Sequence, residues 1–191
     1  VLQKEGHEDV LVVVSAMGKT TNSLESLVET YLNDRCQLKT VVQELERFHL
    51  EIIDELLDKD KDPLKEKVKS LTQELLQFLE HNKSPNYSFV YDQTVSFGEL
   101  ISTTIIAYYL KTIGLPALWL DARKCVKTDS YYRDANLDWE ETQKQIKAQV
   151  SGSNLIISQG FIGSDSNNFT TTLGREGSDY SAAIFAYALG A

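Results

Sequence analysis

The sequence predicts an α/β fold with three layers, in which helices cover both faces of a mainly parallel sheet. Two observations support this class. Short apolar segments with strand character alternate along the chain with longer segments of helical periodicity. The first apolar segment, Val10–Val14, is β-branched except at Leu11, which is typical of a strand buried on both faces. The 191 residues suffice for one domain, or for one domain with a modest insert.

A helix is expected directly after this strand, with Asn22 or Ser23 as its N-cap. Its apolar positions recur at helical spacing: Leu24, Leu27, Val28 and Tyr31.

The next segment, from Leu38 to about His81, predicts two or three amphipathic helices with charged outer faces, broken at Asp62-Pro63. The two apolar stripes are Val41, Leu45, Phe48 and Ile52, then Leu64, Val68, Leu71, Leu75 and Phe78. A coiled coil is the alternative, but each stripe is too short to sustain one. We therefore predict a helical insert over residues 23–84, packed on the main domain.

The α/β pattern returns after the insert. A helix marked by Phe97 and Ile101 stops near Gly114, and a polar helix runs from Asp138-Trp139 to about Val150. Two short strands and a loop are predicted at Ala117–Leu120, Asn154–Ser158 and Gln159–Gly163. The last helix starts near Ser178, and its expected buried residues are Ala182, Phe185, Ala186 and Leu189.

The charge balance restricts the classes of partner. The chain has 19 Lys and Arg against 28 Asp and Glu, a net charge of −9. Such a surface repels phosphate backbones and anionic lipids, so no nucleic-acid or membrane partner is expected. Small anions are compatible with it, because a few arginines or a helix N-terminus bind them locally.

The cysteines and histidines lack the spacing of a metal site or a disulfide framework. Cys36 and Cys125 are far apart, and the three histidines form no HxH or HxxxH pair. We predict no bound metal and, from the cysteine usage, a reducing compartment, with the cytoplasm as location. Residues 1–10 are charged and polar, unlike a secretory leader.

Gly18-Lys19-Thr20 follows a strand, as a phosphate-binding loop does, but that motif requires a glycine where Val13 stands. Two interpretations stay open for this segment. It is a strand end of the kind at which ligands collect in α/β sheets, or it is an ordinary turn with capping residues.

The segment Thr170–Asp179 predicts an anion site, because two glycines and Arg175 converge on the start of a helix. Arg175 has the geometry to bind a carboxylate or phosphate through two parallel hydrogen bonds. Ser178 and Asp179 would lie at the N-cap or in the first turn. The alternative, that they only cap the helix, does not account for the arginine.

Two further charged positions are open to a structural explanation. Glu99, near the start of an apolar helix, either complements the helix dipole or binds a ligand ammonium group. Arg123 is expected to pair with Asp121 or Asp129, and an exposed pair of this kind contributes only about 0–1 kcal/mol.

Four segments, in this order, resemble the aspartate kinases of the amino acid kinase family. They are Val12–Met17 with Thr21-Asn22, Ser96–Glu99, Ser158–Gly163 and Thr171–Ala183. The resemblance covers nearly the whole chain, with the helical insert where the family carries helices. It implies an amino-acid-kinase-like fold and transfer of phosphate from MgATP to the side-chain carboxylate of L-aspartate. No tightly bound cofactor is implied.

The resemblance also implies roles for individual residues. Ser15, Thr21, Glu99, Arg175 and Ser178 would bind aspartate, with Arg175 on the α-carboxylate, Glu99 on the ammonium group and Ser15 beside the reacting groups. Asp179 would be catalytic and would orient a lysine. A general base is not required, because a carboxylate nucleophile is ionised at neutral pH.

Two family segments are not found in this sequence: Lys-Phe-Gly-Gly-Thr-Ser and Thr-Asp-Val-Asp-Gly. We therefore expect an incomplete domain over residues 1–191, the aspartate-binding part, with most of the nucleotide pocket outside it. Alone it should be inactive, and the complete protein should form homo-oligomers. The alternatives are another acceptor (glutamate, acetylglutamate, carbamate or a nucleotide), a catalytically silent binding subunit, or a helical interaction module at Leu38–His81.

Overall fold

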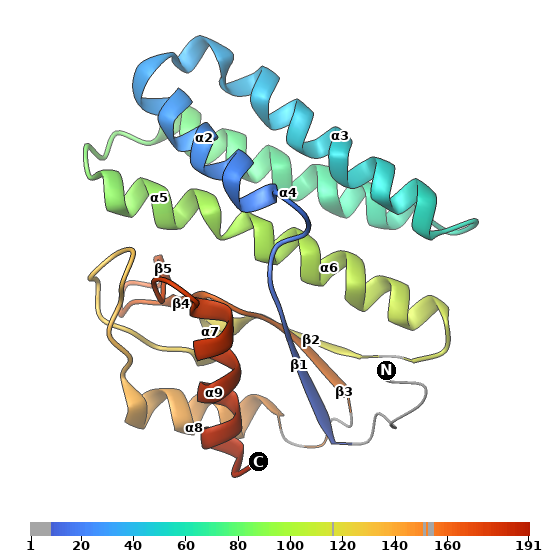
Figure 1. Ribbon diagram of the computed structural model, residues 1–191, viewed down its shortest axis with the longest axis vertical. Helices are drawn as coiled ribbons and strands as arrows, with labels where there is room; N and C mark the ends of the chain where they lie inside the picture. Colours follow the sequence, from blue (N-terminus) through green and yellow to red (C-terminus); the bar gives the residue numbers. More distant parts are fainter. Residues whose placement is uncertain (1–8, 116, 151, 153–154) are drawn as a thin grey trace.

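The computed structural model describes residues 9–115, 117–150, 152 and 155–191. Residues 1–8, on which the expected absence of a leader rests, lie outside this part of the chain, as does Asn154 of a predicted strand. The described residues form three layers, with a sheet between two sets of helices (Figure 1). The predicted fold class is confirmed.

The central layer is a parallel sheet in the order β1-β3-β2. Its strands are β1 (Val10–Val14), β2 (Leu118–Leu120) and β3 (Leu155–Gln159). Val14 pairs with Gln159, and Leu120 pairs with Ser158, so the three carboxyl ends lie at one edge of the sheet. That edge faces the helices drawn above the sheet (Figure 1).

The predicted burial of the first strand is wrong. β1 is half-buried along its whole length, whereas β3 is buried at every position. The cause is strand order: among the described strands β1 has one neighbour and β3 has two. The β-branched run identified a strand correctly but did not place it in the sheet.

Helix α6 (Phe97–Thr112) packs across all three strands on one face of the sheet. On the other face, α9 (Gly177–Leu189) packs against β1, and α8 (Trp139–Val150) packs against α9. The short helix α7 (Ala122–Cys125) follows β2 and contacts α8.

The remaining helices lie beyond α6, away from α8 and α9 (Figure 1). They are α2 (Thr20–Asn33), the 3-10 turn η1 (Arg35–Gln37), α3 (Leu38–Leu56), α4 (Asp62–His81) and α5 (Tyr87–Val95). α3 packs on α4, α2 on α5, and α4 on α6. The helices fall where the insert was predicted, although its limits of 23 and 84 stay a prediction, and α5 was not anticipated.

The predicted buried face of α3 is wrong at three of its four positions: Leu45 is buried as predicted, whereas Val41 and Ile52 are half-buried and Phe48 is exposed. The residues that α3 buries are Leu38, Val42, Leu45, His49 and Ile53. Phe48 is 39% exposed, whereas the His49 side chain is inaccessible to solvent. His49 is a core residue because both ring nitrogens have partners: Nε2 lies 3.3 Å from Thr20 Oγ1, and Nδ1 lies 2.8 Å from the Leu45 carbonyl oxygen.

Two other predicted faces need similar correction. In α4, Leu71 and Phe78 are only partly buried, while Thr72 and Leu79 are buried. In α9, Ala182 and Leu189 are exposed and Ala186 is half-buried. The residues that α9 buries are Gly177, Ser181, Ile184, Phe185 and Ala188. Small and hydroxyl side chains thus take core positions where they pack against a neighbouring element.

Two boundaries also differ from prediction. α2 begins at Thr20, before the predicted caps, and Lys19 at its N-cap makes no side-chain capping bond. The predicted loop after β3 includes a strand: β4 (Ile162–Ser164) pairs antiparallel with β5 (Thr170–Thr172).

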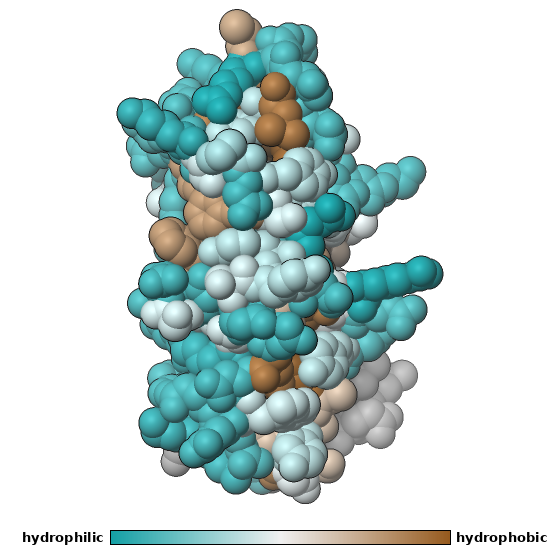
Figure 2. Space-filling view, turned by 90° about the vertical axis from the view of Figure 1, so that its left-hand side faces the viewer, coloured by the Kyte–Doolittle hydropathy of each residue, from teal (hydrophilic) through white to brown (hydrophobic). Residues whose placement is uncertain are grey.

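The surface agrees with the acidic, charged composition. Figure 2 shows one face that is mostly hydrophilic, with apolar residues in small separate patches. None of the described helices combines the length and apolarity needed to cross a membrane.

Candidate active site

The six residues predicted as a site line one cavity of about 560 Å³. They are Ser15, Thr21, Glu99, Arg175, Ser178 and Asp179. They come from the end of β1, the first turn of α2, the first turn of α6, and the loop and first turn that open α9. The cavity lies at the carboxyl edge of the sheet, where ligands bind in open α/β folds. The structure thus brings all six together, and their individual roles stay predictions.

Glycines allow the start of α9 to approach the sheet. A Cβ added at Gly160 would lie 2.8 Å from the Ser178 Cα, and one added at Gly177 would lie 2.5 Å from the Phe161 ring. Ser15 Oγ donates a hydrogen bond of 2.7 Å to Ser178 Oγ, which joins the end of β1 to α9. Close backbone approach therefore fixes this wall of the cavity.

Three residues other than glycine in the cavity wall have left-handed backbones: Arg133 (φ 75°), Phe161 (φ 69°) and Glu176 (φ 58°). Such conformations persist only where surrounding contacts enforce them, and they are frequent at functional sites. At Phe161 the enforcing contact is a 2.8 Å hydrogen bond from its backbone N–H to Ser181 Oγ.

Glu99 supplies a buried negative group. It is 3% exposed, and its Oε1 accepts a 3.2 Å hydrogen bond from the Ala16 backbone N–H. Oε2 has no partner in the described part of the chain. Burial raises the pKa of Glu99 to about 7. An unpaired carboxylate oxygen in a cavity wall favours the interpretation that Glu99 binds a ligand ammonium group over the interpretation that it complements the helix dipole.

Gly98 explains how Glu99 reaches this position. A Cβ at Gly98 would lie 2.8 Å from the Ala16 Cβ, so only glycine lets α6 contact the turn between β1 and α2. Gly98 is therefore a packing requirement that places Glu99 in the cavity wall.

The loops that precede α8 and α9 each contribute an arginine to the cavity. Arg175 and Arg133 both line the cavity, and among the described residues neither guanidinium has a carboxylate within 4.0 Å. Ser178 and Asp179 lie in the first turn of α9, and the N-cap residue Glu176 makes no side-chain capping bond. Exposed N–H groups at a helix start favour an anion, so the structure supports the anion-site interpretation over simple capping.

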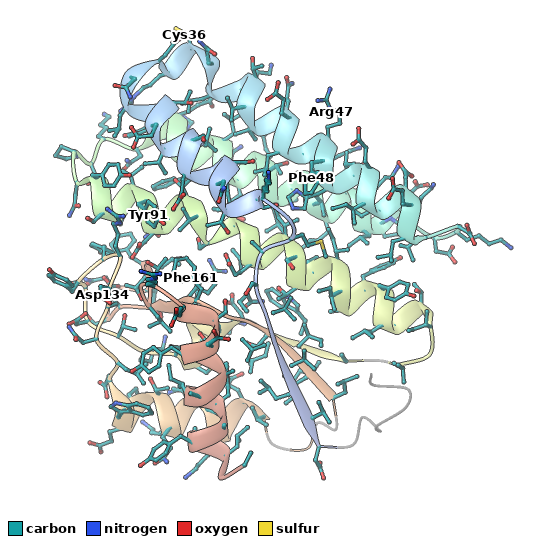
Figure 3. The ribbon with its side chains drawn as sticks, viewed as in Figure 1. Cys36, Arg47, Phe48, Tyr91, Asp134 and Phe161 are labelled. Atoms are coloured by element: carbon teal, nitrogen blue, oxygen red, sulfur yellow. The ribbon has the colours of Figure 1, made fainter. Side chains whose placement is uncertain are left out.

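Sequence reasoning did not identify Arg133, Tyr91 or Phe161 as site residues. Figure 3 shows Tyr91, on α5, directly above the segments that carry Phe161 and Asp134. Tyr91 is 8% exposed, and its hydroxyl donates a 2.7 Å hydrogen bond to Glu25. No local pattern marks Arg133 or Tyr91, because α5 and the loop before α8 meet the cavity only through tertiary packing. Phe161 lies in the Ser158–Gly163 segment, for which no role of its own was predicted.

Arg123 lies outside the cavity lining. Its Nη2 lies 2.8 Å from Asp121 Oδ2, which settles its partner, since Asp129 accepts hydrogen bonds from Asn136 and from the Tyr131 backbone. Asp121 also accepts from the Arg123 backbone N–H at the start of α7. The pair is structural.

Comparison with models of known families matches residues 1–191 to the amino acid kinase family, so the chain belongs to this family. The curated relatives are aspartokinases, as the resemblance predicted. The bifunctional aspartokinase/homoserine dehydrogenase 2 of Escherichia coli is 32% identical over 186 residues, which cover 95% of this chain and 22% of the relative. The lysine-sensitive aspartokinase 3 of Escherichia coli is 31% identical, over 94% of this chain and 40% of the relative.

The same relationship holds for solved structures. Escherichia coli aspartokinase III in complex with aspartate and ADP superposes with a TM-score of 0.85 at 31% identity, over 95% of this chain and 40% of that one. The chain thus spans between about a fifth and two fifths of the length of these relatives.

Proposed function

We propose that this chain carries the aspartate-binding part of an aspartate kinase, which transfers the γ-phosphoryl group of MgATP to the side-chain carboxylate of L-aspartate. One observation carries the proposal: a buried, half-unpaired carboxylate and an unpaired guanidinium line the same cavity at the carboxyl edge of the sheet. The solved relative that binds aspartate and ADP supports the choice of substrates.

The charges of the cavity match an α-amino acid. Glu99 would accept hydrogen bonds from the ammonium group, and Arg175 would bind the α-carboxylate through two parallel bonds. Thr21 and Ser178, which line the same cavity, would offer hydroxyl groups to the remaining oxygens. Holding both α-substituents leaves the side-chain carboxylate as the free nucleophile.

In the proposed reaction a side-chain carboxylate oxygen attacks the γ-phosphorus of MgATP. A new O–P bond forms, the bond from this phosphorus to the bridging oxygen breaks, and ADP leaves. The carboxylate is already ionised, so alignment and charge neutralisation provide the rate enhancement. Ser15 would lie beside the reacting groups, and Asp179 would orient the lysine that the resemblance implies.

Two further parts of the proposal rest on the resemblance and on cysteine usage: homo-oligomers of the complete protein, and a cytoplasmic location. In the structure, Cys36 is exposed and Cys125 buried, and both are free thiols.

The test is ADP release by the full-length protein with MgATP and four acceptors: L-aspartate, L-glutamate, N-acetylglutamate and carbamate. Release that depends on aspartate and collapses in Arg175→Ala is the expected result. Release with a different acceptor would keep the fold and overturn the substrate. No release from folded protein would favour a silent binding subunit.

A further inference from the structure

We propose that Arg133 is a second carboxylate-binding residue, which acts beside Arg175 on the α-carboxylate of the acceptor amino acid. This inference rests on the proposed function and adds a specificity-determining residue to it.

Arg133 lies on the same wall as Arg175. A second hollow of about 750 Å³ adjoins the cavity, and the two share Arg133, Gly174 and Arg175 in their linings. The two arginines therefore lie where the hollows meet, whereas Glu99 lines only the first. Both arginines thus border the second hollow, whose lining also includes Asp134.

Two tyrosine rings orient the Arg133 guanidinium. Its Cζ lies 4.5 Å from the centre of the Tyr91 ring and 5.4 Å from that of Tyr87. The ring positions are fixed in turn, because Tyr91 donates a 2.7 Å hydrogen bond to Glu25 and Tyr87 donates one of 3.2 Å to Glu29. A stacked arginine loses less conformational entropy when it binds a ligand than a free one does.

A buried carboxylate holds the Arg133 backbone in its left-handed conformation. The Arg133 N–H donates to both oxygens of Asp92, at 3.2 and 3.0 Å. Asp92 is inaccessible to solvent and also accepts 2.8 Å hydrogen bonds from the backbone N–H and the hydroxyl of Thr172. A left-handed backbone that buried contacts enforce is frequent at functional positions, so we infer that the position of Arg133 is functional.

The charge of the cavity requires a second cation. Glu99, Glu176 and Asp179 line it, against the two arginines. Glu99 would pair with the ammonium group, which leaves Glu176 and Asp179 facing an acceptor with two carboxylates, and Arg175 alone would offset only part of the repulsion. Arg133 offsets it, and in the described residues its guanidinium has no carboxylate partner within 4.0 Å.

The test compares two ligands on the full-length protein by calorimetric titration: L-aspartate and its α-amide, L-isoasparagine, which lacks only the α-carboxylate charge. Arg133→Met should weaken aspartate binding by about 10- to 100-fold, the effect of losing a charge-assisted hydrogen bond. It should weaken α-amide binding by less than about threefold. Arg133→Lys, which keeps the charge without the planar stack, should lie between wild type and Arg133→Met.

Arg35→Met is the matched control. Arg35 also stacks on a tyrosine, with its Cζ 4.0 Å from the centre of the Tyr31 ring, but it lines neither hollow. This variant should bind aspartate as the wild type does. If Arg133→Met does not fold, Arg133→Lys carries the same two-ligand comparison.

Each outcome decides the question. Aspartate binding within about twofold of wild type in a folded Arg133 variant overturns this inference and leaves the proposed function intact. Equal weakening for both ligands assigns Arg133 a structural role and also overturns it. Wild-type protein that binds neither ligand overturns the proposed function together with this inference.

Discussion

Asp92 and Glu99 are buried carboxylates at the junction of α5 and α6, and their surroundings differ. Asp92 accepts four hydrogen bonds, from the backbone of Arg133 and from Thr172. Glu99 accepts one, and its second oxygen is unpaired in the described structure. Burial raises the pKa of both, to about 6 for Asp92 and about 7 for Glu99.

We infer that Asp92 is a structural carboxylate, whereas the unpaired oxygen of Glu99 is available to a ligand, as the proposed function requires. Protein groups donate hydrogen bonds to both oxygens of Asp92, so these bonds stabilise the folded state without a ligand. The unpaired oxygen of Glu99 destabilises the folded state, because its lost hydration is not compensated until a hydrogen-bond donor enters the cavity. Binding of an ammonium group would therefore recover free energy that folding left unused.

The largest effect is expected at Asp92. In Asp92→Ala, the backbone N–H groups of Arg133 and Thr172 lose a buried acceptor, which should lower the free energy of unfolding by about 3 kcal/mol. Urea denaturation measures this. The control is Asp54→Ala, where the carboxylate is 43% exposed and pairs with Lys61 and Lys65 at the surface, and a much smaller loss is expected. Equal losses in the two variants would contradict a special role for Asp92.

A substitution at Glu99 is expected to raise the free energy of unfolding, whereas one at Asp92 lowers it. Below pH 4.5 Glu99 is protonated in both the folded and the unfolded state. Between pH 4.5 and 7 it ionises in the unfolded state but stays protonated in the folded state, so the free energy of unfolding falls as the pH rises. Glu99→Gln should therefore stabilise the unliganded protein above pH 7, by about 1–2 kcal/mol, with its own unpaired amide reducing the gain. Denaturation at pH 8 and pH 5 checks this, because the gain should shrink at pH 5. A less stable variant at pH 8 would show that Glu99 is structural.

Substitutions at Arg175 and Asp179 are expected to affect different steps of the proposed reaction. Arg175→Ala should raise KM for aspartate by about 30-fold with little change in kcat, because it removes binding that ground state and transition state share. Asp179→Ala should chiefly lower kcat. Steady-state kinetics on full-length protein separate the two, and equal KM values for wild type and Arg175→Ala would remove the carboxylate-binding role.

Local patterns in the sequence were sufficient for β1, β2, β3, α6 and α8, and for the predicted anion-binding segment around Arg175. Each depends on a few neighbouring residues, such as the β-branched run before Ser15 or the glycines around Arg175. The family resemblance selected the six residues that line the cavity, and the comparisons confirm the family.

The features that were not predicted depend on contacts between distant segments. His49 is a core residue because Thr20 meets its ring. The β4–β5 hairpin is held from outside by a 2.7 Å hydrogen bond between Thr128 and Thr171. Arg133 reaches the cavity only because Asp92 binds its backbone. Side-chain type and periodicity carry no information about such pairs.

The smallest effect we predict concerns the pH dependence of binding. Only the ionised Glu99 would pair with an ammonium group, and its pKa of about 7 in the empty cavity means that most molecules carry the neutral acid at pH 6. Aspartate binding at pH 6 should therefore be about tenfold weaker than at pH 8. In Glu99→Gln the affinity should be low at both values and nearly independent of pH. Calorimetric titration at the two pH values, with the heat of buffer ionisation varied to count protons released, measures the effect. Wild-type affinity that is constant from pH 6 to pH 8 would mean that Glu99 is already ionised in the empty cavity, and the contrast with Asp92 would then rest on hydrogen bonding alone.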